Sequence, residues 1–229
     1  TSNLESISLA RIIGEAARLS ELKVIIGETP GFKRRFGFFN SIVRIAEKEI
    51  ISPTICKGDV DLIIALEATE GLRQFRKYAN KKTKVVLNKR IISATRTSKL
   101  QISFDGILNE LNEKASEISV ADAASIADRE FNDTKAIECL LLSKAIERGW
   151  LPFEFDILVS ALFQVSSKDA FELHLGALNY FTKNELKTVQ SFPSLFSLMT
   201  GNQAAAYGAI SAGVQFAFGY PGSPVTEII

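Results

Sequence analysis

The sequence predicts an α/β protein: a domain with a parallel sheet and a helical appendage, followed by the first α/β unit of a second domain. Three observations predict this class. Helix-type and strand-type apolar periodicities alternate as far as Asn88, helix-type segments then follow one another, and a glycine-rich segment closes the chain. The 229 residues, 46% apolar and 23% charged, are enough for one or two domains with a proper core.

The first part of the chain predicts a sheet with helices between its strands. Residues Ile7–Leu19 form an amphipathic helix, because their apolar residues recur along one helical face. Residues Asp59–Ala68 form a continuous apolar run bounded by charges, as expected of a strand covered on both faces. The other expected elements are strands at Leu22–Ile26, Phe38–Ile45 and Lys84–Asn88 and a helix at Glu70–Tyr78.

The middle of the chain predicts helices only. They are expected at Ile107–Ile118, Val120–Arg129, Thr134–Arg148, Glu154–Phe163 and Lys168–Phe181. Asp156 and Leu158 also fit a strand, but the apolar stripe that includes Leu158 and Leu162 fits a helix better. Gly149 is expected just after the end of a helix, with Pro152 beyond it.

The end of the chain predicts a separate unit. We expect a first domain over residues 1–183, a linker over 184–200 and the start of a second domain over 201–229. The second unit would hold a small-residue helix, Ala204–Ala212, and a short buried strand, Val214–Phe218. Both ends look truncated, since no strand or glycine-rich turn precedes the first helix and the chain stops one turn into a new helix.

Composition argues against several classes of protein. A formal net charge of +1 gives no reason to expect nucleic acid or a membrane surface as a partner. Two separated cysteines are too few for a disulfide scaffold, a zinc site or an iron–sulfur cluster. No apolar run reaches the length of a membrane span, and no signal peptide is visible. We therefore expect a soluble, cytoplasmic protein.

The loop "FGYPGSPVTE" is the best candidate binding site in the sequence. Tyr220 is held extended by the proline after it, and Gly222 lets a ligand approach the backbone. Ser223 offers a hydroxyl, and Pro224 opens a helix whose free N–H groups could face an anion. A tight surface turn capped by Ser223 is the alternative, and the residues alone favour it.

A family resemblance changes that balance. The stretch "TGNQAAAYGAISAGVQFAFGYPGSPVTEI" resembles the opening of the alpha subunit of 2-oxoacid:acceptor oxidoreductases, which act on pyruvate, 2-oxoglutarate or indolepyruvate. The matching residues are Gly201, Asn202, Ala204, Ala212, Gly213, Tyr220, Pro221, Pro224 and Glu227. Ser223 stands where the family has Thr and keeps the hydroxyl, whereas Val225 replaces a Ser. Gly222 is the residue of the indolepyruvate branch.

The preceding part resembles the gamma subunit of the same enzymes. In "GFKRRFGFFNSIVRI" the residues Gly31, Arg35, Gly37, Ser41, Val43 and Arg44 match the family, while Phe36 and Ile42 depart from it. "DVDLIIALEATEGLR" is similar to the strand and helix that follow in that subunit. The chain thus resembles a gamma–alpha fusion that lacks the first gamma strand. The second unit would be the start of a thiamine-diphosphate-type pyrimidine domain.

The resemblance implies part of an enzyme. Such enzymes decarboxylate a 2-oxoacid with thiamine diphosphate and pass electrons through an iron–sulfur cluster to ferredoxin. It implies a beta subunit carrying the thiamine diphosphate and Mg²⁺ site, an iron–sulfur cluster on a partner or a missing region, and a dimer of heterodimers. This chain alone would bind no cofactor and be inactive.

The resemblance also assigns roles to residues. Ser223 would contact the substrate, with Tyr220 and Gly222 shaping the loop. The remaining matched residues, expected at an interface or facing the active site, are Arg35, Gly37 and Arg44. Outside the resemblance, we expect Glu67 and Glu70 to be surface charges, His174 to be structural and Trp150 to be a core or interface anchor.

Two other classes of function stay open. A non-catalytic assembly or binding protein that retains the gamma-type fold is the main alternative. A dinucleotide-binding enzyme is a weaker one, because no GxGxxG motif precedes the first helix.

Overall fold

The computed structural model describes residues 8–29, 40–92, 103–184 and 197–218. The chain divides into two compact units, Thr1–Pro193 and Ser194–Ile229. The candidate site and both hydrophobic cores lie in the first unit. Each unit is described by itself below.

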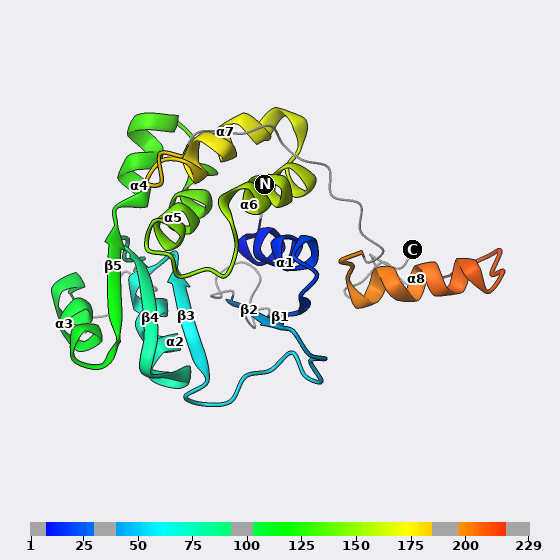
Figure 1. Ribbon diagram of the computed structural model, residues 1–229, viewed down its shortest axis with the longest axis horizontal. Coiled ribbons are helices and arrows are strands. Elements are labelled where there is room, and N and C mark those ends of the chain that lie inside the picture. Colours follow the sequence, from blue (N-terminus) through cyan, green and yellow to red (C-terminus); the bar gives the residue numbers. More distant parts are fainter. Residues whose placement is uncertain (1–7, 30–39, 93–102, 185–196, 219–229) are drawn as a thin grey trace. The chain divides into compact units, whose positions relative to one another are not determined.

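A three-stranded parallel sheet forms the centre of the first unit (Figure 1). Its strands are β3 (Val60–Ala65), β4 (Ala79–Asn88) and β5 (Glu117–Ala121), in the order β3-β4-β5. Helix α2 (Ala68–Tyr78) connects β3 to β4, and α3 (Phe104–Lys114) precedes β5. The predicted α/β architecture with a parallel sheet is therefore confirmed.

Strand β5 corrects the sequence prediction, which placed helices at Ile107–Ile118 and Val120–Arg129. Helix α3 ends at Lys114 because Ala115 turns extended, and β5 then pairs with β4 along its whole length. Ile118 and Val120 are β-branched residues two positions apart, which suits a pleated strand. Pairing with β4 therefore outweighs the helical pattern, and the first helical turn after β5 is α4 (Ala123–Ile126).

Strands β1 (Lys23–Thr29) and β2 (Asn40–Ala46) form a second, antiparallel sheet of their own. The sequence pattern predicted that they belong to the parallel sheet, and this prediction is wrong. Residues 30–39 separate the two strands, which is fewer than the crossover of about a dozen residues that parallel neighbours need. The short spacing was therefore a signal for antiparallel pairing.

The two faces of the parallel sheet pack against different helices. Val85 and Leu87 face α2 and α3, whereas Val86, between them, faces the larger core. The helices of the larger core are α1 (Leu9–Leu19), α5 (Ala136–Glu147), α6 (Phe155–Val165) and α7 (Lys168–Leu178), with the π-helical turn η1 (Ala127–Phe131) beside them. Helix α5 is apolar on most sides, so it lies at the centre of this core.

The end of α5 was predicted correctly. Gly149 has φ +65°, and its N–H donates to the carbonyl of Ile146 at 2.8 Å. The N–H of Trp150 donates to the carbonyl of Ala145 at 3.0 Å, which completes a Schellman motif. Glycine is favoured here because a side chain would strain the left-handed backbone.

The described part of the second unit is one helix, α8 (Gly201–Ser211), with the residues around it. Thr200 and Gln203 form a reciprocal capping box at its start. The predicted buried strand at Val214–Phe218 is wrong: these residues have no strand structure, and Phe216 and Phe218 are 78% and 95% exposed. In the described part of this unit no strand is available to pair with their backbone.

Gly71 sets how closely α2 approaches the sheet. A Cβ at this position would lie 2.6 Å from the Cβ of Ala65 and 3.3 Å from a methyl carbon of Leu87. We expect Gly71→Ala to lower the free energy of unfolding by about 1–3 kcal/mol, because overpacking outweighs the gain in helix propensity. Urea denaturation measures the change. Gly208→Ala, where no atom lies within 4 Å, is the control, and a Gly71→Ala variant as stable as wild type would contradict the prediction.

Candidate functional site

The carboxyl edge of the parallel sheet is the first place to look for a site, since open α/β sheets bind ligands there. Asn88, fully buried at the end of β4, joins its neighbours on both sides. Its amide Nδ2 donates to the carbonyl of Leu66 at 3.0 Å, and its Oδ1 accepts from the N–H of Ala123 at 3.1 Å. One side chain thus fastens the ends of all three strands.

Glu67 occupies the same edge and is 6% exposed, so its predicted role as a surface charge is wrong. Its carboxylate caps α2, accepting from the N–H groups of Thr69 and Glu70 at 3.0 and 2.6 Å. It also accepts from the N–H of Ile92 at 3.1 Å, which ties down the chain after β4. Free N–H groups at a helix start stabilise a buried carboxylate, which explains its position.

Glu70 is likewise not a free surface charge. Its carboxylate accepts from the side-chain amide of Gln74 and forms an ion pair with Arg73 at 2.8 Å. Only 15% of the side chain is exposed. The carboxylates at the start of α2 are therefore engaged by the helix itself: Glu67 caps its first turn and Glu70 contacts side chains further along it.

Asn88 is the residue whose loss should loosen this edge. We expect Asn88→Ala to lower the free energy of unfolding by about 2 kcal/mol, because it leaves the carbonyl of Leu66 and the buried N–H of Ala123 without their partner. Chemical denaturation tests this. Thr83→Val, which removes a buried hydroxyl from the other end of β4, is a control for losing a buried polar group. Amide hydrogen exchange should rise at Ala123 in the Asn88 variant only, and unchanged protection there would refute the role.

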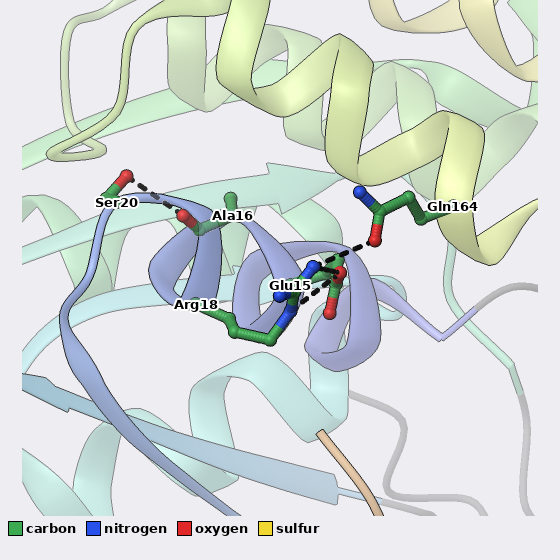
Figure 2. Close-up of polar contacts among 5 residues, drawn as sticks. All are labelled: Glu15, Ala16, Arg18, Ser20 and Gln164. Carbon is green, nitrogen blue, oxygen red and sulfur yellow. Dashed lines mark hydrogen bonds and ion pairs between the residues drawn. The ribbon is translucent and has the colours of Figure 1, made fainter. Parts of the chain in front are cut away.

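A buried ion pair within α1 is linked by a hydrogen bond to α6 (Figure 2). Arg18 Nε donates to Glu15 Oε1 at 2.9 Å, and Nη2 donates to the same oxygen. Nη2 also donates to Gln164 Oε1 of α6 at 2.9 Å. The side chains of Arg18 and Glu15 are 11% and 9% exposed, so this contact belongs to the helix packing. Sequence reasoning missed it, although the spacing of three on a helix was a usable signal.

Three further titratable side chains lie on the helices of the larger core, Glu138 partly buried and Cys139 and His174 buried. Burial raises the pKa of Glu138 to about 7, although its Oε2 accepts from the N–H of Leu9 at 3.2 Å. Burial likewise raises the pKa of the Cys139 thiol to about 12, which leaves it unreactive at neutral pH. Burial lowers the pKa of His174, which is 1% exposed, in keeping with the expected structural role.

Most of the predicted site residues lie outside the described residues: Arg35, Gly37, Tyr220, Gly222 and Ser223. Arg44 is described, on β2. Its Nη1 donates to the carbonyls of Ser52 and Thr54 at 2.9 and 3.0 Å. Arg44 therefore holds the segment after β2 in place, and a role at an interface or active site stays a prediction.

The residues that the structure describes offer no set of ligands for a metal ion. Among the described residues no group of three or more His, Cys, Asp or Glu side chains could hold a metal ion. An iron–sulfur cluster commonly takes four thiolates, whereas the sequence has two cysteines, Cys56 exposed and Cys139 buried. An iron–sulfur cluster therefore does not fit the residues present. No helix in the described ranges is long and apolar enough to cross a membrane.

Helices on both faces of a parallel sheet, with a carboxyl edge closed by its own caps, define an open α/β domain. Its family follows from the sequence. The chain belongs to the pyruvate ferredoxin/flavodoxin oxidoreductase family, whose pattern matches residues 6–180. The resemblance to these oxidoreductases is therefore confirmed.

Two curated relatives cover most of the same region. The chain is 29% identical over 176 residues to indolepyruvate oxidoreductase subunit IorB of Archaeoglobus fulgidus, covering 76% of this chain and 86% of that protein. It is 27% identical over 159 residues to the subunit of the same name from Methanothermobacter thermautotrophicus, covering 68% and 79%. The similar proteins are thus subunits of 2-oxoacid oxidoreductases.

Two solved structures share the fold. A 2-oxoglutarate:ferredoxin oxidoreductase from Magnetococcus marinus, with 2-oxoglutarate, coenzyme A and succinyl-CoA bound, matches with a TM-score of 0.66 and 19% identity. The match covers 97% of this chain but 37% of that one, so this chain spans little more than a third of it. The gamma subunit of a keto/oxoacid ferredoxin oxidoreductase from Geobacter sulfurreducens matches with a TM-score of 0.51 and 13% identity, covering 76% and 89%.

Proposed function

We propose that this chain is part of a 2-oxoacid:acceptor oxidoreductase that carries out thiamine-dependent oxidative decarboxylation and passes electrons to ferredoxin. The observation that carries the proposal is the family match over residues 6–180 together with two relatives that are oxidoreductase subunits. The names of those relatives favour indolepyruvate as the substrate, in line with the Gly222 of the indolepyruvate branch.

The described domain supplies structure to the complex in this proposal. Its carboxylates at the sheet edge cap α2 and its buried Asn88 joins the strands, so this region acts as a rigid scaffold. Ser223 contacts the substrate, with Tyr220 and Gly222 shaping the loop. The residues proposed for an interface, or to face the active site, are Arg35, Gly37 and Arg44.

The cofactors lie largely on partners. A beta subunit provides the site for thiamine diphosphate and Mg²⁺, and thiamine diphosphate supplies the carbanion chemistry of decarboxylation when bound. The iron–sulfur cluster belongs to a partner or to a region missing from this sequence. The assembly is a cytoplasmic dimer of heterodimers, and this chain alone is inactive.

Native mass spectrometry on the protein purified anaerobically from its source tests the proposal. We expect a complex with a second subunit that carries thiamine diphosphate and iron, and ferredoxin reduction with indolepyruvate, pyruvate or 2-oxoglutarate. A free 25.1 kDa chain without a partner or cofactor would overturn the enzyme assignment.

A non-catalytic assembly protein with the gamma-type fold is the second candidate. The self-capped carboxyl edge favours it, because the polar groups described there bind the fold itself. A stable complex that lacks thiamine diphosphate and reduces no acceptor with any of the three acids would select this alternative.

A further inference from the structure

Residues 73–84, "RQFRKYANKKTK", contain six cationic side chains and no acidic one, in a chain whose formal net charge is only +1. This run covers the end of α2 and the start of β4, which follow each other without a loop. The amino end of β4 is opposite the arrowheads of the sheet, so the run lies away from the carboxyl edge (Figure 1).

Three of these cations are paired, among them Lys84 with Glu117 at 4.0 Å, and three are not. Arg73 pairs with Glu70, and Arg76 donates to both oxygens of Glu110 at 2.8 and 2.5 Å, which lowers the pKa of Glu110 to about 2. The remaining three side chains are exposed, and no acidic side chain of the described residues pairs with any of them: Lys77, Lys81 and Lys82. We call Arg73, Arg76, Lys77, Lys81 and Lys82 the basic ridge.

The backbone of the ridge is held in place. The pairing of β3 with β4 shifts register between Val60 and Leu62, so β4 bulges where the two lysines lie. Asn80 Oδ1 accepts from the N–H of Lys82 at 2.6 Å, and Asn80 Nδ2 donates to the carbonyl of Gly58 at 2.6 Å. Thr83 Oγ1 donates to the carbonyl of Val60 at 2.6 Å. Because these hydrogen bonds already fix the backbone of the bulge, the backbone loses little conformational entropy when a partner binds.

A shallow, open depression lies on the α2 part of the ridge. Thr69 and Leu72 join three cations of α2 in lining this depression of about 410 Å³: Arg73, Arg76 and Lys77. Its lining is mostly polar and charged, since Leu72 is buried. Arginine and tyrosine are enriched at protein interfaces, and Tyr78 lies under Lys77, 4.6 Å from ring centroid to Nζ.

We propose that the basic ridge docks an acidic surface of another subunit of the oxidoreductase complex. The proposal rests on the proposed function, which supplies the partner. Complementary charge steers two subunits together and fixes their register, and a local excess of cations on a nearly neutral chain fits a local acidic patch better than a long polyanion.

Carbodiimide cross-linking of the purified native complex tests the contact directly, because it joins lysine Nζ atoms to carboxylates with no spacer. Mass spectrometry should identify cross-links from Lys77, Lys81 or Lys82 to Asp or Glu of a second subunit. Ridge lysines that cross-link only within this chain, or react freely with an acylating reagent in the intact complex, would overturn the proposal. The complex would still show thiamine-dependent activity, so the proposed function would survive that result.

Two double variants with the same change of net charge test whether partner binding depends on the ridge or only on the total charge of the chain. Lys81→Glu/Lys82→Glu reverses the ridge at the start of β4, whereas Lys89→Glu/Arg90→Glu reverses two exposed cations just after its end. We expect the first variant to bind the purified partner subunit about tenfold more weakly at low salt, mainly through slower association, and the second to bind as wild type does.

Equal binding by both variants, or equal loss in both, would refute the ridge as the docking surface. Circular dichroism shows whether each variant is folded, and Lys81→Gln/Lys82→Gln, which only removes charge, should weaken binding less than the reversal. Binding of the free chain to phosphatidylserine vesicles or duplex DNA that is lost in the Lys81→Glu/Lys82→Glu variant would overturn the proposal. The ridge would then bind a membrane surface or a nucleic acid and not an acidic subunit. If no partner subunit is found, both the proposed function and this inference fail.

Discussion

Replacing Arg18 by Ala should destabilise the first unit by about 3–5 kcal/mol, because Glu15 would stay buried without its counter-charge. The variant also loses the hydrogen bond from Arg18 to Gln164, which joins α1 to α6 (Figure 2). Urea denaturation followed by circular dichroism gives the change in the free energy of unfolding. Such a loss would be a large part of the stability of a typical domain.

An exposed ion pair supplies the control for this prediction. Arg129 and Glu130 pair at 2.8 Å with side chains 67% and 44% exposed, so Arg129→Ala should cost less than about 1 kcal/mol. Glu15→Met/Arg18→Met removes both buried charges together and should be far more stable than Arg18→Ala. If the single and double variants unfold at the same urea concentration, an unpaired buried charge is not the cause.

The second prediction concerns pH. Burial raises the pKa of Glu138 to about 7 in the folded state, whereas an exposed glutamate titrates near 4.5. The folded protein therefore binds this proton more tightly than the unfolded chain. The stability contributed by Glu138 is complete below pH 4.5, falls as pH rises towards 7 and is lost above it. The loss between pH 5 and pH 8 should be about 2–3 kcal/mol.

Glu138→Gln isolates this effect, since glutamine does not titrate and can still accept from the N–H of Leu9. The free energy of unfolding of the variant, minus that of wild type, should rise by the same amount from pH 5 to pH 8. The comparison also cancels His174, whose lowered pKa acts oppositely by reducing stability as pH falls. A difference that stays constant with pH would show that Glu138 titrates alike in both states.

Sequence patterns predicted the elements whose apolar residues recur at a regular spacing within the element itself. Helices α1, α2, α5, α6 and α7 follow apolar periodicity, and Gly149 marked the end of α5 because a left-handed residue is a local requirement. Strand β5 and the separate β1–β2 sheet were missed because both depend on which strand lies alongside. The apolar run Val214–Phe218 after α8 looked like a strand, but local composition says nothing about a pairing partner.

The candidate site was harder to predict for the same reason. Glu67 looked like an ordinary surface charge, yet it caps α2 and accepts from Ile92, 25 residues along the chain. Asn88 was marked only as the end of a strand, and its two backbone partners lie just after the neighbouring strands β3 and β5. Motif matching identified the family instead, because a family pattern records tertiary requirements that periodicity does not contain.

The contact between α1 and α6 also sets the order of events during synthesis. Arg18 and Gln164 are 146 residues apart, so a ribosome adding about 5–20 residues per second makes α1 roughly 7–30 s before its partner helix. The pairing of Glu15 with Arg18 needs only one helical turn and can form at once, and β1 and β2, which also contact α1, follow soon after, while the face of α1 that packs on α6 waits for that helix. Nascent chains halted before α6 should therefore bind chaperones through α1, and release should coincide with the emergence of Gln164.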